Sequence, residues 1–387
     1  MSLPIKMRNA ADKTDLSLEE QAVLYLSRID LQGGHAEEIR GFLRDHASKL
    51  DYHKVWALAR MNLVSPLLFR NLMNIEGIPA DVMNGLKEAY LITLKRNLVH
   101  AGETVNILDL LREAGIDAIP IKGSLASEIV LGDMGLYPTG DIDLLVRQSD
   151  LGRAKSALLN TGYTEDAARS EGDLLESSYH LIFARDGDVI ELHWDLLKWF
   201  FNGSPDFWWE ETMKVGYEGQ EITLLSPERY LLYCIFHLFT HRFAPLKFYL
   251  LITGLIYRYR KEIRWDRLFA FASQHRMIRL TTFTLRLLHD FFGTEIPDEC
   301  LNRDILGYGL LRYVVVSGLF QEMKRSYVRL AFFTILLDSP LDTLGVLLRR
   351  ILPLPSEIRL RYGLSAGSRK VYLYYLMNPF LMMIKKR

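Results

Sequence analysis

The sequence predicts an α+β protein in which a small mixed-sheet core is flanked by N-terminal and C-terminal helical domains. Three observations predict it. Apolar residues have helical spacing up to residue 114, short apolar runs bounded by glycine follow from residue 115, and helical patterns return after Ser226-Pro227. We therefore divide the chain into residues 1–114, 115–225 and 226–387.

The N-terminal domain is expected to be helical from Ser17 onward. Ser17 is a helix-capping residue, and Glu20, three residues later, completes a capping box. Pro79 precedes the longest helical pattern. The predicted helices are Gln21–Ile29, Ala36–Leu50, Tyr52–Met61, Ser65–Met73 and Ala80 to about Ala114.

The central domain mixes strands and helices. The predicted strands are Ile116–Ile121, Asp141–Val146, Tyr179–Phe183 and Val189–Trp194, and the predicted helices are Ser124–Leu131 and Asp150–Thr161. The last two strands are joined by Asp186-Gly187-Asp188, so we expect them to pair as a hairpin.

The C-terminal domain is again predicted to be helical. Pro227 fits the first position of a helix, with Ser226 as its cap. The strongest apolar helix patterns are Leu231–His241, Leu246–Tyr259, Trp265–His275 and Ile278–Phe292.

Composition indicates a folded protein and leaves several partners open. The 387 residues are 49% hydrophobic and 24% charged, with zero formal net charge, which gives no case for a nucleic-acid coat. Residues 324–387 nevertheless contain 12 Lys or Arg against 3 Asp or Glu, a net of +9. This basic tail can bind phosphate, a membrane surface or the acidic remainder of its own chain.

The sequence predicts a cytoplasmic location. Cys234 and Cys300 lie far apart without metal-ligand spacing, so we interpret both as reduced. The polar N-terminus has no apolar signal region, and no run reaches the ~18 apolar residues of a spanning helix. Val371–Ile384 is apolar and precedes a basic end; it can lie on a membrane surface, but we favour a packed helix.

The first candidate for chemistry is the tripeptide Lys122-Gly123-Ser124 between a strand and a helix. Gly123 allows close approach of a ligand to the backbone, and the N–H groups of the next helix can receive phosphate oxygens. Ser124 can donate its hydroxyl, and Lys122 can neutralise charge. In isolation the tripeptide is also an ordinary helix start.

The second candidate is the pair Asp141 and Asp143. Residues i and i+2 lie on one face of a strand, so both carboxylates can converge on a divalent cation. The apolar residues that follow predict a buried strand, where two free acids are costly. The alternative is that both acids lie at the exposed start of the strand and cap the turn at Gly140.

The third candidate is Glu191, on a strand with apolar neighbours, which can supply a third carboxylate. The alternative is an ordinary exposed strand residue. His193 is expected to be a hydrogen-bonded histidine rather than a ligand. Together, the phosphate turn and the three acids fit Mg²⁺ (or Mn²⁺), because magnesium takes carboxylate and phosphate oxygens as ligands.

These motifs resemble the polymerase-beta-like nucleotidyltransferases, and within them the uncharacterised bacterial nucleotidyltransferase family. The resemblance rests on the Lys122-Gly123-Ser124 turn, the Gly140–Val146 strand, Gly162-Tyr163 after the next helix, and Glu191-Leu192-His193-Trp194. It also covers the helical flanks and so spans most of the chain.

The resemblance implies transfer of a nucleoside monophosphate from a nucleoside triphosphate to an acceptor, with release of pyrophosphate. It implies that Gly123 and Ser124 hold the triphosphate, that Asp141 and Asp143 bind the metals, and that Glu191 aids activation of the acceptor hydroxyl. The acceptor can be a protein, a sugar, a small molecule or an RNA.

Three departures from the family pattern keep an alternative open, a catalytically degenerate nucleotide-binding or regulatory protein. Sixteen residues separate Ser124 from Asp141, more than is usual, and Tyr137 stands where many relatives have Arg. Leu251 lies near a position where relatives often have Asp. A further alternative is a membrane-surface protein of a polysaccharide or peptide-modification pathway.

Three other groups are expected to be structural. His237 and His241 share a helix face but lack the Glu of a zinc-protease motif. Trp208-Trp209 is expected to pack or form a lid. The run Arg258, Arg260, Lys261 and Arg264 is expected to form a solvated face, although it can also guide an anionic substrate.

Overall fold

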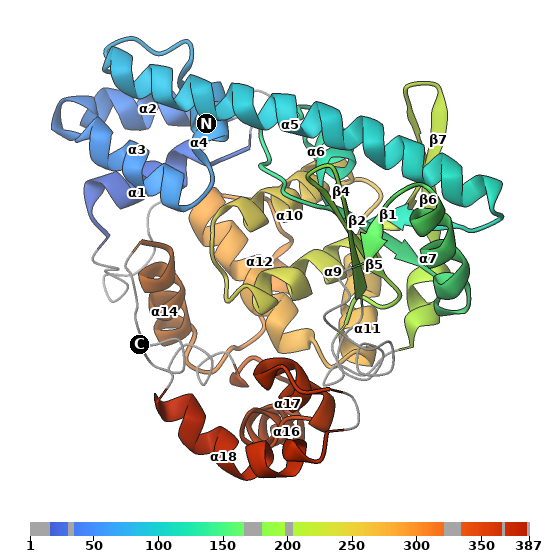
Figure 1. Ribbon diagram of the computed structural model, residues 1–387. Helices are drawn as coiled ribbons and strands as arrows, with labels where there is room; N and C mark the ends of the chain where they lie inside the picture. The colour runs from blue at the N-terminus through green and yellow to red at the C-terminus, as the bar shows by residue number, and fades with distance from the viewer. Residues whose placement is uncertain are drawn as a thin grey trace.

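The structure is a computed structural model that describes residues 16–29, 35–165, 180–197, 204–320, 334–365 and 368–384. The α+β prediction is confirmed: a mixed five-stranded sheet lies between two groups of helices (Figure 1).

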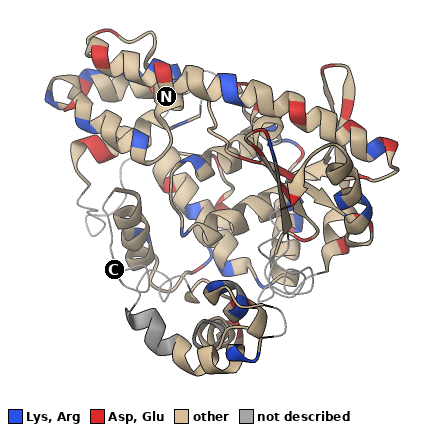
Figure 2. Cartoon of the chain, in the orientation of Figure 1, with Lys and Arg blue, Asp and Glu red and all other residues tan. Residues whose placement is uncertain are grey.

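Helices form the N-terminal part of the described chain. They are α1 (Leu18–Leu26), α2 (His35–His46), α3 (Tyr52–Met61), α4 (Ser65–Leu72) and α5 (Ala80–Glu113), with a 3-10 turn at Ala47–Lys49. The predicted capping box is confirmed, because Ser17 and Glu20 each accept a backbone N–H of the other. The long helix α5 carries residues of both charges and runs from the N-terminal helices to the sheet (Figures 1 and 2).

The sheet has the strand order β1-β2-β5-β4-β3. Only β2 and β5 are parallel; the other neighbours pair antiparallel. The strands are β1 (Ala118–Pro120), β2 (Ile142–Val146), β3 (Thr164–Glu165), β4 (His180–Arg185) and β5 (Asp188–His193), with helices α6 (Ser124–Leu131) and α7 (Leu151–Asn160) and a 3-10 turn at Gln148–Asp150. The predicted hairpin of β4 and β5 is confirmed, while Tyr179 lies outside the described residues.

A second hairpin was absent from the sequence prediction. It consists of β6 (Thr212–Tyr217) and β7 (Gln220–Leu225), preceded by a 3-10 turn at Pro205–Trp209. Glu218 and Gly219 form its turn, and both have positive φ. The alternating exposure along β6 is typical of a strand with one covered face.

The C-terminal part returns to helices, as predicted. Pro227 is the first residue of α9, but the Ser226 side chain accepts no capping hydrogen bond. The helices are α9 (Pro227–Thr240), α10 (Lys247–Arg258), α11 (Trp265–Gln274), α12 (Ile278–Phe292), α13 (Asp298–Leu301), α14 (Tyr308–Phe320), α16 (Pro340–Ile351), α17 (Pro355–Tyr362) and α18 (Lys370–Ile384). Cys234 and Cys300 are buried and unpaired.

Helix α6 connects the two apolar cores of the molecule. Leu125 and Ile129 pack into the core of the sheet, whereas Ala126 and Val130 pack into a larger core that includes helices of both flanks. The domain boundaries at 114 and 225 stay predictions, because this larger core is shared between the N-terminal and C-terminal helices.

Gly254 allows α10 to lie close to α6. A Cβ atom at Gly254 would lie 2.4 Å from Cδ2 of Leu131, inside van der Waals contact. This close approach brings the beginning of α10 near the turn that precedes α6, where the candidate site lies.

Candidate active site

The turn between β1 and α6 contains the predicted phosphate-binding residues. Gly123 has φ +94° and ψ −155°, a conformation that residues with side chains rarely adopt. Ser124 is buried and is the first residue of α6. The first N–H groups of a helix have no partner within it and carry the positive end of its dipole. The turn therefore has the geometry of an anion site.

Two of the predicted acids are direct neighbours across parallel strands. Asp143 of β2 pairs in register with Glu191 of β5. Asp143 is only 1% exposed, whereas the Glu191 side chain is partly exposed. Asp141 lies one residue before β2, which begins at Ile142 rather than at Asp141 as predicted. The structure thus brings all three acids to one end of β2.

Lys122 holds the acids together. Its Nζ lies 2.9 Å from Oδ1 of Asp143 and 3.5 Å from Oδ2 of Asp141. Burial lowers the pKa of Lys122, but Asp143, Asp141 and Glu191 outweigh burial and hold it above its ordinary value. The ammonium group therefore stays charged and compensates the buried carboxylates.

His193 belongs to the same cluster. Its Nε2 lies 3.0 Å from Oδ1 of Asp143 and 3.3 Å from Oε2 of Glu191. Burial lowers the pKa of His193, but hydrogen bonds to Asp143 and Glu191 raise it above its ordinary value overall. The hydrogen bonds expected for His193 are present, and their partners are the candidate acids themselves.

Within the cluster, Glu191 is stabilised as an anion. Burial raises its pKa, but the hydrogen bond from His193 and the charge of Lys122 lower it to about 2. A carboxylate with so low a pKa is a weak proton acceptor at neutral pH. Its chemistry suits cation binding better than proton storage.

The cluster fits a divalent cation. Asp143, Glu191 and His193 offer ligand atoms that all lie within 4.8 Å of one another. Oδ2 of Asp143 is buried and has no hydrogen-bond partner among the described residues. A buried carboxylate oxygen without a partner is costly, and a metal ion would satisfy it. The oxygen donors are those that magnesium and manganese prefer.

Lys247 is a further cation near the site that the sequence analysis did not identify. It is the first residue of α10, and its Nζ donates to the backbone oxygen of Pro138 at 3.0 Å. Burial lowers its pKa, against smaller raising effects of Asp141 and Asp143. Among the described residues, no carboxylate lies within ion-pair distance of Lys247.

The two residues that depart from the family pattern are buried. Tyr137 lies beneath Lys247, with Nζ 5.5 Å from the ring centroid, and burial raises its pKa. Leu251 packs in the larger core. Neither residue supplies a charged group to the cluster.

The histidine pair has a packing role. The rings of His237 and His241 lie 4.5 Å apart, and both contact the ring of Phe248. Burial and the charge of Lys122 hold the pKa of His237 well below its ordinary value, so it is neutral.

The paired tryptophans also pack. Trp208 is buried and donates from Nε1 to Oδ1 of Asp195 at 3.0 Å. Arg258, Arg260, Lys261 and Arg264 are exposed, as predicted for a solvated face.

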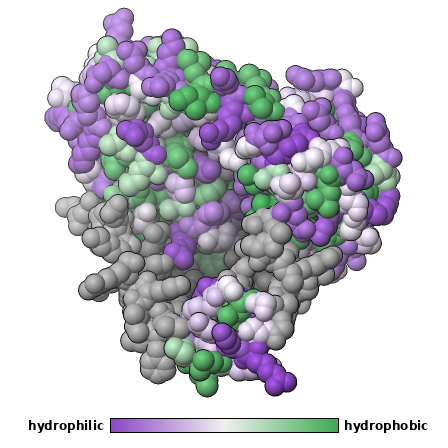
Figure 3. All heavy atoms as spheres, viewed as in Figure 1, coloured by the Kyte–Doolittle hydropathy of each residue, from purple (hydrophilic) through white to green (hydrophobic). Residues whose placement is uncertain are grey.

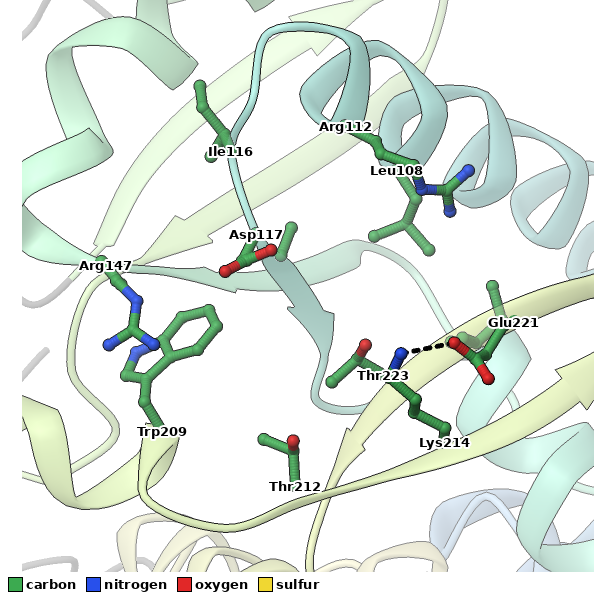
Figure 4. Close-up of a pocket in the computed structure, with 12 residues that line it drawn as sticks. Leu108, Arg112, Ile116, Asp117, Arg147, Trp209, Thr212, Lys214, Glu221 and Thr223 are labelled. Carbon is green, nitrogen blue, oxygen red and sulfur yellow. Dashed lines mark hydrogen bonds and ion pairs between the residues drawn. The ribbon is translucent and has the colours of Figure 1, made fainter.

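Two of the pockets in the described part of the chain lie outside the cluster. One, of about 460 Å³, is at the opposite end of β2, where Arg147 stacks on Trp209 and Asp117 faces the same space (Figure 4). Another, of about 660 Å³, lies beside Arg260 and Lys261. Neither contains a residue of the acidic cluster.

Comparison with known proteins identifies a family. A family model described as "Uncharacterised nucleotidyltransferase" matches residues 48–293, well over half of the chain. The matched residues contain the turn, all three acids, His193 and Lys247. No curated protein and no solved structure gave a match.

Proposed function

This chain belongs to the uncharacterised nucleotidyltransferase family, and from that premise we propose that it transfers a nucleoside monophosphate from a nucleoside triphosphate to an acceptor hydroxyl, with Mg²⁺ or Mn²⁺ as cofactor. The observation that supports this most is the pairing of Asp143 with Glu191 across β2 and β5, beside Asp141 and Lys122.

Asp141, Asp143 and Glu191 would hold the metal. When bound, a divalent cation neutralises phosphate charge and makes the attacking oxygen more acidic. His193 orients the acids from behind through its hydrogen bonds. Because the acids already have Lys122 and His193 as partners, the cluster is held in place before any ligand arrives.

The triphosphate would lie on the turn. The N–H groups at the start of α6, opened by Gly123, can receive its oxygens, and the Ser124 hydroxyl can donate to one of them. Lys122, in the turn before α6, and Lys247, at the start of α10, both supply positive charge. Lys247 stands at a helix N-terminus, where a cation is unfavourable and an anion is stabilised, and this supports a phosphate beside it.

In the reaction, the acceptor oxygen forms a bond to the α-phosphorus while the bond to the oxygen bridging to the β-phosphorus breaks. Pyrophosphate leaves and the acceptor proton is released. The low pKa of Glu191 makes it a poor store for that proton. We therefore propose that Glu191 contributes negative charge and positions the metal, and that the proton of the acceptor hydroxyl is released to solvent.

The test combines binding and transfer. Thermal unfolding is measured with each nucleoside triphosphate, with and without Mg²⁺ or Mn²⁺, and labelled triphosphates are then incubated with cell lysate. We expect at least one triphosphate to stabilise the protein only with metal, and its label to pass to a lysate component. Absence of stabilisation by every triphosphate with either metal would exclude the proposed site.

Asp143→Asn and Asp150→Asn form a matched pair for this test. Asp150 is paired with Arg153 at the surface, away from the cluster. Asp143→Asn should abolish the metal-dependent stabilisation, and Asp150→Asn should preserve it. Since Asp143 is ion-paired in the fold, Asn should also lower the unliganded melting temperature, so the increment on adding ligand is the readout.

The same experiment separates the enzyme from a degenerate binder, which would be stabilised by nucleotide but transfer no label. It also identifies the class of acceptor, because labelled protein, sugar, small molecule and RNA separate by protease, glycosidase and nuclease digestion.

The unpaired, buried Cys234 and Cys300 support the further proposal of a reducing, cytoplasmic compartment.

A further inference from the structure

Helix α16 carries its leucines on the outside, whereas Val346 packs against the larger core. Leu341, Leu344, Leu348 and Leu352 follow the spacing i, i+3, i+7 and i+11, so they form one stripe, and Leu341 is 78% exposed. A surface helix normally turns such a stripe toward the core. The stripe on α16 is reversed, and it extends just past the end of the helix.

The polar side of α16 explains this orientation. Asp342 accepts from Nη1 of Arg276 at 2.9 Å, and the Thr343 hydroxyl donates to the backbone oxygen of Thr334 at 3.0 Å. These contacts fix the polar face against the body of the protein. The leucines are therefore exposed because of specific contacts on the opposite face.

Helix α18 shows the same reversal. Its inner side is held by α17, where Nη1 of Arg361 donates to Oδ1 of Asn378 at 2.7 Å and the rings of Tyr362 and Tyr374 stack. Tyr372, Leu373 and Leu376 remain exposed, Leu376 to 76%. Both helices lie at one end of the molecule (Figure 1) and present apolar residues to solvent, and Figure 3 shows hydrophobic residues at the surface of that end.

The charge around this apolar surface is positive. In the described residues 334–365 and 368–384 there are six Lys or Arg against three Asp or Glu, and basic residues are visible on the C-terminal helices (Figure 2). An apolar stripe beside basic residues is the pattern of a helix that lies in the interface of an anionic bilayer. A second copy of the chain would instead bring two basic segments together, which is unfavourable.

We propose that the outward faces of α16 and α18 dock this protein on an anionic membrane surface, with the leucines in the headgroup region and the basic residues against the lipid phosphates. Among the described residues, no helix is long and apolar enough to span a membrane. The proposal is therefore of peripheral contact, and it is independent of the nucleotide site.

The test is flotation with vesicles. The full chain is mixed with vesicles of phosphatidylcholine plus phosphatidylserine, or of phosphatidylcholine alone. We expect binding to the anionic vesicles, weakened by salt because charges contribute, and much less binding to the neutral ones. The variant with both Leu344→Glu and Leu348→Glu should bind anionic vesicles at least about tenfold less, since it removes two inserted leucines and adds two negative charges.

Leu159→Glu is the matched control. Leu159 lies on α7 and is 41% exposed, close to the 47% of Leu348, but it is outside the apolar surface. The Leu159→Glu variant should bind anionic vesicles as well as the wild type does. Leu376→Glu on α18 is a second, independent variant and should also weaken binding. Far-ultraviolet circular dichroism checks that each variant is folded.

Three results would overturn the proposal. Wild-type protein that floats with neither vesicle type would do so, as would equal binding by the wild type and the double variant. A wild-type dimer that the double variant converts to monomer would show that a second copy covers this face. Metal-dependent stabilisation by nucleotide should be equal in all four proteins, so the membrane result and the nucleotide result are read separately.

Discussion

The two ends of strand β2 contain very different assemblies of charge. At its beginning, buried Asp143 is surrounded by Lys122, His193 and Glu191, and one of its oxygens is left without a partner. At its end, about 13 Å further along the strand, Arg147 stacks on Trp209 beside an open pocket. The pocket at the second end contains none of the acids that cluster at the first end. We therefore locate the candidate active site by its buried, mutually compensating charges rather than by the volume of a cavity.

Of the variants that test this difference between the two ends of β2, Glu191→Gln should have the largest effect on turnover. Loss of one preorganised charge at a reacting phosphate is expected to reduce turnover by ~10²–10³-fold. Label transfer at saturating triphosphate measures it. An unchanged rate would show that Glu191 is an ordinary strand residue and that the third acid must be sought elsewhere.

The same variant should alter acid stability in metal-free buffer. The pKa of Glu191 is lowered from 4.5 to about 2 in the fold, so the ionised carboxylate stabilises the native state above pH 4.5 and this contribution is lost as the pH falls toward 2. Chemical unfolding between these two pH values should show a shallower decline for Glu191→Gln than for the wild type. Parallel curves would contradict the assigned pairing with His193 and Lys122.

Lys247→Met tests whether the cation on α10 belongs to the site. Loss of a charge-assisted bond to phosphate should weaken triphosphate binding ~10–100-fold. Lys247→Arg should retain most of the affinity, and Lys95→Met, at an exposed position of α5, should have no effect. Titration of nucleotide in the presence of metal gives the affinities; equal values for Lys247→Met and Lys95→Met would place Lys247 outside the site.

Ser124→Ala should have a smaller effect at the same end. One neutral hydrogen bond to phosphate is worth ~0.5–1.5 kcal/mol, a loss of about two- to thirteenfold in affinity. Gly123→Val should cost more, mainly because φ of +94° strains a β-branched residue; a Cβ there would lie 3.5 Å from the Asp141 oxygen, an ordinary contact. Wild-type affinity in Gly123→Val would remove the turn from the site.

Arg147→Met should have the smallest effect. It removes the cation from the pocket at the other end of β2, where we expect no change in nucleotide affinity or label transfer beyond about twofold. The same titration and transfer measurements apply. A loss comparable to that of Lys247→Met would mean that the two ends of β2 form one extended site.

Local sequence was sufficient to predict much of the fold and the core of the candidate site. The helices, the shared strand face expected for Asp141 and Asp143, and the glycine turn all depend on neighbours within a few residues, through periodicity, capping and the two-residue repeat of a strand. The second hairpin was predictable in principle from Glu218-Gly219 and from the alternation of polar and apolar residues before it. Residues 48–293 also carried the family resemblance that the comparison confirmed.

By itself, the sequence determined which residues carry charge and on which face of its helix or strand each one lies, because these properties depend on short-range geometry. Tertiary structure alone decided that His193 bonds Asp143 and that Glu191 has a low pKa, since both follow from the parallel register of β2 and β5. It also decided that Lys247, distant in sequence, lies near Asp141. Charge interactions depend on distance in space and on burial, and neither is fixed until the helices and the sheet have packed.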